Sequence, residues 1–194
     1  MLTLALRCLV ISAVLFSPDA FAHNPLSQSL SFSAGLRHPL TGLDHLLAML
    51  TVGLWCVTRG GRAVWLWPVT FIGFMLLGFT VAGTGLPVPY VEAAVSSSVV
   101  ILGLCVALAV KAPAWLGAGL VGLFAFFHGH AHGSEAVSPQ LVSYAAGLVL
   151  ATVVIQAAGI GLGRAAQRAY GLSALRLAGG LAALGGAALT VALA

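Results

Sequence analysis

The scarcity of charge constrains this chain more than any other feature of its sequence. Only 6% of its 194 residues are Asp, Glu, Lys or Arg, whereas 60% are hydrophobic, and the mean hydropathy is +1.09. A soluble domain carries charge on about 25% of its residues. Such a chain cannot cover itself with a water-facing surface. We therefore expect an all-α polytopic bundle that lies in a lipid bilayer.

The first 22 residues have the three parts of a cleavable signal peptide. Arg7 gives a positive start, residues 8–16 form a short apolar core, and residues 20–22 read Ala-Phe-Ala, the pattern that precedes cleavage. The apolar run is too short to span a bilayer comfortably, although an uncleaved first helix is the alternative. Cleavage would leave a mature domain of residues 23–194 that begins at His23.

Six apolar segments follow, each with about the 20 residues that a transmembrane helix needs. They cover residues 36–58, 63–83, 90–110, 113–132, 140–163 and 172–193. Gly, Pro and basic residues separate them, as is typical of turns. The sequence therefore predicts six transmembrane helices after the signal peptide.

The basic residues predict how these helices are oriented. Six of them lie in or beside alternate connections, namely Arg59, Arg62, Lys111, Arg164, Arg168 and Arg176. Only Arg37 lies on the opposite side. Basic residues favour the cytoplasmic face, so we expect an inner-membrane protein with a periplasmic mature N-terminus, as the signal peptide also requires. Because they form no cluster, nucleic acid is not an expected partner.

The acidic and histidine residues of the mature domain are all placed on the periplasmic side by this topology. They are Asp44, Glu92 and Glu135, with histidines 23, 38, 45, 128, 130 and 132. A charged side chain in a membrane segment costs about 2.5–3.5 kcal/mol on insertion scales, so such residues usually have a function. Imidazole and carboxylate groups together are typical ligands of divalent transition metals.

The first predicted helix carries His38, Asp44 and His45. The two histidines are seven residues apart and would share one face of a straight helix. Asp44 could bind the ion directly or orient an imidazole. Pro39 suits a first helical turn. Met49, one turn further, is either a thioether ligand or core filler.

The fourth predicted helix ends in three alternating histidines followed by a carboxylate. These residues are His128, His130, His132 and Glu135. On an intact helix His128 and His132 share a face and His130 points elsewhere, whereas an unwound turn would let all three converge. Glu92, in the first turn of the third helix, is a ligand, a partner for Arg37 or a residue of the membrane interface.

The two motifs resemble those of the HupE/UreJ family of bacterial membrane proteins. The first reads His-Pro-x-x-Gly-x-Asp-His at residues 38–45, and the second reads Phe-His-Gly-His-Ala-His-Gly-x-Glu at residues 127–135. The resemblance covers essentially the whole chain. It implies a permease for nickel, or in some relatives cobalt, that is linked to hydrogenase or urease systems. It also implies that the histidines and carboxylates of both motifs serve that function.

The residues alone support a broader statement. The donors suit Ni²⁺, Co²⁺, Zn²⁺ or Cu²⁺ as the transported ion, and we expect no prosthetic group and no enzymatic activity. One alternative is a membrane-embedded zinc hydrolase, in which three histidines and a carboxylate would hold Zn²⁺ and an activated water. Haem binding by paired histidines is another, although all the histidines lie on one side.

Overall fold

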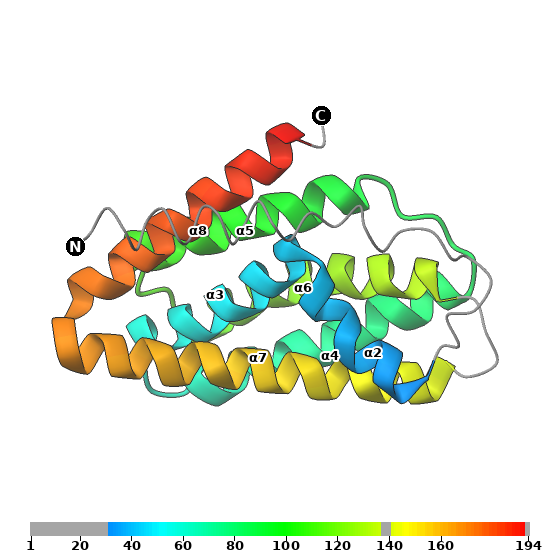
Figure 1. The fold of residues 1–194 in the computed structure, drawn as a ribbon, viewed down its shortest axis with the longest axis horizontal. Helices are drawn as coiled ribbons and strands as arrows, with labels where there is room; N and C mark the ends of the chain where they lie inside the picture. The colour runs from blue at the N-terminus through cyan, green and yellow to red at the C-terminus, as the bar shows by residue number, and fades with distance from the viewer. Residues whose placement is uncertain (1–30, 137–140, 193–194) are drawn as a thin grey trace.

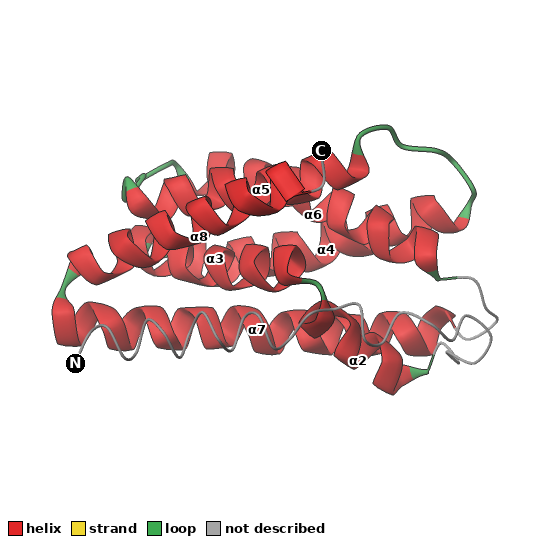
Figure 2. Cartoon of the chain, turned by 45° about the horizontal axis from the view of Figure 1, so that its top comes forward, coloured by secondary structure: helices red, strands yellow, loops and turns green. Residues whose placement is uncertain are grey.

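The structure, a computed structural model, describes residues 31–136 and 141–192. The predicted signal peptide and His23 lie outside these residues. The described residues form helices and no strands (Figure 2). In chain order the helices are α2 (Phe32–Thr41), α3 (Leu43–Arg59), α4 (Ala63–Gly83), α5 (Val91–Ala107), α6 (Ala114–Glu135), α7 (Leu141–Tyr170) and α8 (Leu172–Ala192).

Several of these helices could cross a membrane. Four of them are long and apolar enough by themselves, namely α4, α6, α7 and α8, and the bent pair α2–α3 makes a fifth candidate. Helix α5 is apolar but has only 17 residues. Each predicted segment thus coincides with a helix or a helix pair, and the protein is a multi-pass membrane protein. The count of six spans stays a prediction.

The first predicted helix is broken at Gly42. Helix α2 ends at Thr41, α3 begins at Leu43, and the two are bent by 85° (Figure 1). Gly42 has φ −92° and ψ 112°, which lies outside the helical region. The prediction of one straight helix from residue 36 is therefore wrong. Pro39 lies inside α2 near its end, and not in a first turn.

Close backbone packing joins α4 to α6. A Cβ atom at Gly78 would collide with the carbonyl of Phe126, and one at Gly129 would collide with the carbonyl of Met75. Small residues allow helices in lipid to approach in this way. Helix α5 packs on α8, and α2 and α3 pack on α7. The result is an elongated bundle in which α4, α6 and α7 run along the long axis and α2 crosses it (Figure 1).

Four side chains bind carbonyl groups of the α5–α6 connection, at the end of the bundle that carries most of the basic residues. Each donates one hydrogen bond: Trp55 Nε1 to Val110 (3.0 Å), Arg59 Nε to Ala112 (2.7 Å), Trp67 Nε1 to Ala114 (2.8 Å) and Arg176 Nε to Ala107 (2.9 Å). We call this end the basic end. It is fastened by donors from α3, α4 and α8.

Candidate metal centre

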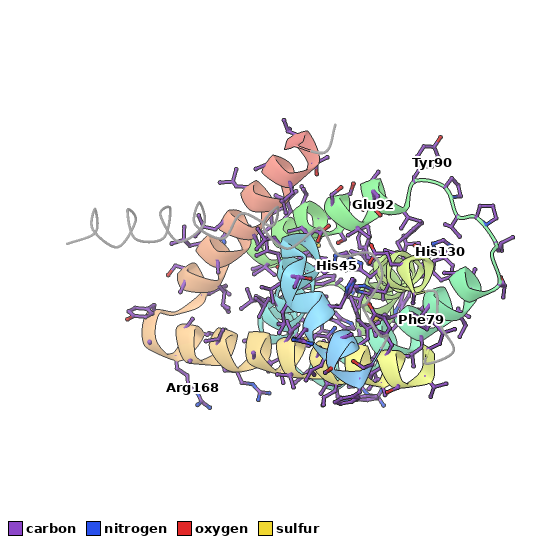
Figure 3. All side chains as sticks on the ribbon, turned by 45° about the vertical axis from the view of Figure 1, so that its right-hand side comes forward. His45, Phe79, Tyr90, Glu92, His130 and Arg168 are labelled. Atoms are coloured by element: carbon purple, nitrogen blue, oxygen red, sulfur yellow. The ribbon has the colours of Figure 1, made fainter. Side chains whose placement is uncertain are left out.

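Three helices bring four imidazole rings together at the other end of the bundle. His38 comes from α2, His45 from α3, and His128 and His132 from α6. The ring centroids are 4.8 Å apart for His38–His132, 4.4 Å for His45–His132 and 4.9 Å for His45–His128. We call these four residues the histidine cluster. In Figure 3 His45 lies far from Arg168, which is near the basic end.

The break at Gly42 decides how the first motif reaches this cluster. His38 and His45 do not share a face of one straight helix. They approach His132 from two helices that meet at 85°. The backbone of Gly42 also lies against Asp44 and His45, because a Cβ there would be 3.0 Å from Asp44 Oδ1 and 3.1 Å from His45 Nδ1. A side chain at this position would crowd both groups.

Helix α6 stays helical to Glu135, so its three histidines do not converge. His128 and His132 are one turn apart and share the face that meets α3. His130 is also buried, but its Nε2–H donates to the carbonyl of Leu86 at 3.1 Å. His130 thereby holds the connection between α4 and α5, and no ring contact joins it to the histidine cluster within the described residues.

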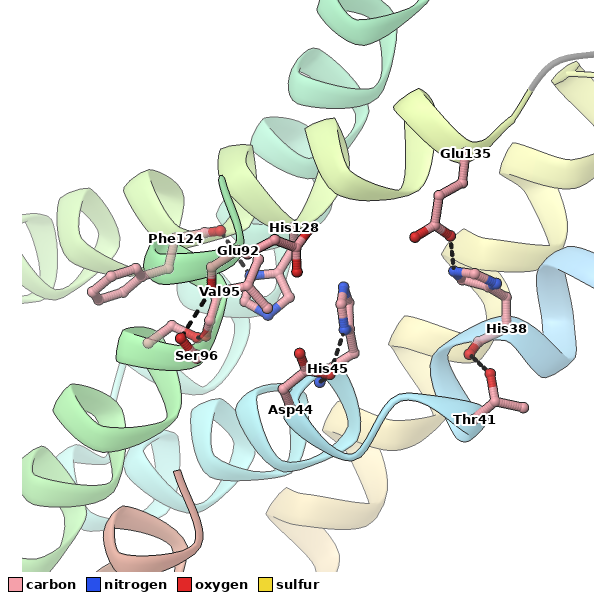
Figure 4. Close-up of polar contacts among 11 residues, drawn as sticks. His38, Thr41, Asp44, His45, Glu92, Val95, Ser96, Phe124, His128 and Glu135 are labelled. Carbon is pink, nitrogen blue, oxygen red and sulfur yellow. Dashed lines mark hydrogen bonds and ion pairs between the residues drawn. The ribbon is translucent and has the colours of Figure 1, made fainter. Parts of the chain in front are cut away.

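Two carboxylates flank the cluster, as Figure 4 shows. Asp44 Oδ1 is 2.7 Å from His45 Nδ1 and also accepts the backbone N–H of His45. Glu135 Oε2 is 3.2 Å from His38 Nε2. Glu135 is largely exposed, with 61% of its side chain accessible, while Asp44 is mostly buried, at 19%. One carboxylate thus faces the outside and the other faces the interior of the bundle.

These hydrogen bonds leave imidazole lone pairs directed into a buried space. Nδ1–H of His128 donates to the carbonyl of Phe124 at 2.8 Å, and Nδ1–H of His45 donates to Asp44. In both rings Nε2 is then the nitrogen with the lone pair. Both Nε2 atoms, and both ring nitrogens of His132, are buried without a hydrogen-bond partner in the protein. A buried polar atom in that state costs about 1–3 kcal/mol.

The four imidazole rings lie near one another, but they are not placed to coordinate one metal ion. Within residues 31–136 and 141–192 no group of three or more His, Cys, Asp or Glu side chains is placed to hold a metal ion. Zinc, for comparison, binds imidazole nitrogen at about 2.0–2.1 Å. Ring centres 4.4–4.9 Å apart place the imidazoles near one another without such coordination.

The remaining predicted ligands lie apart from the cluster. Glu92 is exposed in the first turn of α5, and it forms no ion pair among the described residues. Arg37, its suggested partner, instead donates to the carbonyl of Ser33 at 3.2 Å. Met49 is completely buried in the hydrophobic core.

Two aromatic residues line the cluster that sequence reasoning did not select. The Phe71 ring centroid is 5.8 Å from that of His128, and the Tyr144 centroid is 5.9 Å from that of His38. Both residues are buried. Nothing in the sequence distinguishes them from other aromatic residues of apolar helices. Their rings add apolar surface beside His128 and beside His38, which strengthens electrostatic interactions there.

Two comparisons with known proteins agree with the motifs. The profile of the family described as "HupE / UreJ protein" matches residues 11–189. A curated relative, "Protein HupE" from Rhizobium leguminosarum bv. viciae, is 45% identical over 159 residues, which cover 81% of this chain and 83% of the relative. No solved structure matches the chain.

Proposed function

Because this chain belongs to the HupE/UreJ family, we propose that it is an inner-membrane permease for a divalent transition-metal cation, most suitably Ni²⁺. The ion is the substrate and not a resident cofactor. Its capture site consists of the histidine cluster with Asp44 and Glu135. Capture occurs on the periplasmic side, and release occurs at the basic end.

One observation carries this proposal. Imidazole rings from three different helices meet in a buried space, and three of the four have lone pairs without a partner in the protein. Buried polar groups are nearly always hydrogen-bonded, so several unpaired nitrogens side by side indicate a ligand. These nitrogens bind a group that accepts an electron pair, and a metal dication is such a group.

The surroundings of the rings support a cation in particular. Asp44 holds His45 in the tautomer whose Nε2 carries the lone pair, an arrangement that also makes the imidazole a better donor. Glu135 and Asp44 together offer two negative charges against one dication. Glu92 stays a predicted ligand, which at its exposed position would act at the entrance.

The orientation rests on charge, because basic residues favour the cytoplasm. The cluster would then face the periplasm, where the ion is captured. Supply to a hydrogenase or a urease is the expected use of the ion inside the cell.

The hydrolase alternative is less well supported. A zinc hydrolase needs a metal-bound water and a carboxylate that can act as general base. Here Asp44 accepts two hydrogen bonds from His45, and Glu135 pairs with His38. Both carboxylates of the site are therefore already engaged in positioning imidazoles.

The test is uptake of radioactive Ni²⁺ by cells that express the chain, with Co²⁺ and Zn²⁺ as competitors. The variants H38A, D44A and H132A each remove one group of the capture site, and we expect uptake to fall to the level of cells without the protein. The matched control is His130→Gln, which changes a histidine of the same helix and keeps a donor for Leu86. It should retain most of the uptake.

Expression of every variant is measured in the membrane fraction, so that uptake is compared per molecule. Uptake equal to wild type in all three capture-site variants would contradict the proposal. Equal loss in His130→Gln would show that the assay reports a general effect of histidine replacement.

A further inference from the structure

The buried polar atoms that lack a partner fall into two groups. Seven such side-chain atoms occur in the described residues. Five belong to histidines at the capture end, and the other two are the amide nitrogen and oxygen of a single residue, Gln156, in the middle of α7. Gln156 is 1% exposed. Its whole amide is thus buried in an apolar bundle with nothing to bind.

Other buried polar residues do not share this state. The hydroxyl of Thr51 donates to the carbonyl of Leu47 at 2.6 Å, that of Ser98 donates to Val95 at 2.6 Å, and the thiol of Cys56 donates to Ala63 at 3.4 Å. Thr51 and Ser98 are thus satisfied by the backbone of their own helices, as is usual in membrane helices, and Cys56 is satisfied by the first residue of α4. The buried amide of Gln156 has no such hydrogen bond to the backbone.

Gln156 lies beside two further donors of electron pairs. Thr152, one turn earlier on the same face of α7, is fully buried. Its hydroxyl donates to the backbone carbonyl of Leu148 at 2.9 Å and lies 3.5 Å from the sulfur of Met75 on α4, and its oxygen keeps a lone pair. Met75 is fully buried as well. Long side chains lean toward the start of their helix, which for Gln156 is the side of Thr152.

This group begins at the level of the histidine cluster and extends deeper into the bundle. The backbone carbonyl of Met75 contacts Gly129, which lies between His128 and His132, so Met75 is level with the cluster. Gln156 is deeper, at the level of Gly53 on α3, since a Cβ at Gly53 would be 2.5 Å from the backbone carbonyl oxygen of Gln156. Gly53 is eight residues beyond His45, which is about 12 Å along a helix.

We propose that Gln156, Thr152 and Met75 form a second, inner site, at which the divalent cation pauses after it leaves the histidine cluster. This inference rests on the proposed permease function. The donors are an amide oxygen, a hydroxyl oxygen and a thioether, all of them neutral. They bind a dication more weakly than imidazoles flanked by carboxylates. A weaker inner site is what release toward the other side requires.

The test separates binding from passage, with Ni²⁺ alone as the probe. Wild-type protein and the variants Gln156→Leu, Gln156→Met and Thr152→Val are purified, titrated with Ni²⁺ in detergent, and reconstituted in vesicles that contain a Ni²⁺-sensitive dye. We expect the affinity of the capture site to stay within twofold of wild type, while the rate of entry falls about tenfold or more. His45→Ala should lose both.

Thermal stability distinguishes a transport role from a structural one. Replacing an unpaired buried amide by an apolar side chain of similar size should leave the melting temperature unchanged or raise it. The matched control is Ser98→Ala, which removes a buried hydroxyl that already has a partner on α5. Its entry rate should equal that of wild type.

Wild-type entry rates in both Gln156 variants, with His45→Ala inactive, would overturn the inner site and leave the permease function standing. A lowered melting temperature in both Gln156 variants would also overturn it, because Gln156 would then be structural. If wild-type protein binds Ni²⁺ but moves none into vesicles, the permease function itself fails, and the inner site fails with it.

Discussion

The imidazoles of His45 and His128 are each fixed by a hydrogen bond from Nδ1, and this leaves Nε2 as the nitrogen available to a metal. The two fixing groups differ, because His128 uses the carbonyl of Phe124 whereas His45 uses the carboxylate of Asp44. Of these two groups, only the carboxylate of Asp44 contributes charge. Asp44 therefore has two separable effects, orientation of the ring and attraction of the cation.

The variant Asp44→Asn separates these effects. Asparagine keeps an oxygen that can accept from His45 Nδ1–H but carries no charge. We expect its Ni²⁺ affinity to fall about tenfold, to a value between those of wild type and Asp44→Ala. Titration calorimetry of the purified protein measures this. An affinity equal to that of wild type would show that the charge contributes nothing to binding.

Capture should also depend on the pH of the outer side. An imidazole must be neutral to bind a metal, so protons compete with the metal for the same ring nitrogens. Lowering the outer pH shifts this competition toward the proton, so affinity falls as pH falls. Uptake measured between pH 7.5 and 5.5, at constant internal pH, checks this. Uptake that rises on acidification would contradict imidazole ligation.

Sequence reasoning selected the four histidines that the structure brings together. It placed His38, His45, His128 and His132 at one end of the bundle because hydropathy and the positive-inside rule fix where each helix enters the membrane. It could not foresee the hydrogen bond of His130 to Leu86, which depends on a loop 44 residues away. It also passed over Gln156, although an amide within an apolar helix is itself unusual.

At the scale of single elements, the contact of α4 with α6 positions His128. The backbone of Gly129 touches that of Met75, so no side chain fits between them. Because both helices are rigid at this point, room for a methyl group can come only from moving one helix away from the other.

We therefore expect Gly129→Ala to destabilise the protein by about 1–3 kcal/mol and to lower its melting temperature. The control lies on the same helix. A Cβ at Gly119 would meet nothing within 4 Å, so Gly119→Ala should be neutral or slightly stabilising. Thermal unfolding in detergent, followed by circular dichroism, compares the two. Equal melting temperatures would argue against the tight contact.

The helices themselves were predictable, but the break in the first one was not. Runs of apolar residues mark the helices because a bilayer leaves few other backbone structures. Gly42 gives no such signal, since glycine is common within transmembrane helices. Its break is set by tertiary contacts: α2 packs on α7 through Gly35, where a Cβ would collide with the carbonyl of Tyr144.

At the scale of the whole molecule, the two ends of the bundle carry opposite chemistry. Ser134, beside the histidine cluster, and Arg62, at the basic end, are both exposed. In a background without the native cysteines, a cysteine at either position reports which side of the membrane it faces.

We expect Ser134→Cys to react with a membrane-impermeant maleimide in intact spheroplasts, and Arg62→Cys to react only after permeabilisation. Mass-shift labelling on a gel provides the measurement. The reverse labelling pattern would show that the histidine cluster faces the cytoplasm, and it would reverse the proposed direction of transport.

Four hydrogen bonds at the basic end join α3, α4 and α8 to residues 107–114. Each bond contributes about 0.5–1.5 kcal/mol, and all four act on one short stretch of chain. A motion that carries this stretch away from α3, α4 and α8 must break them together. In the permease that we propose, an exit that requires this motion opens in discrete events, and we expect the turnover of a carrier.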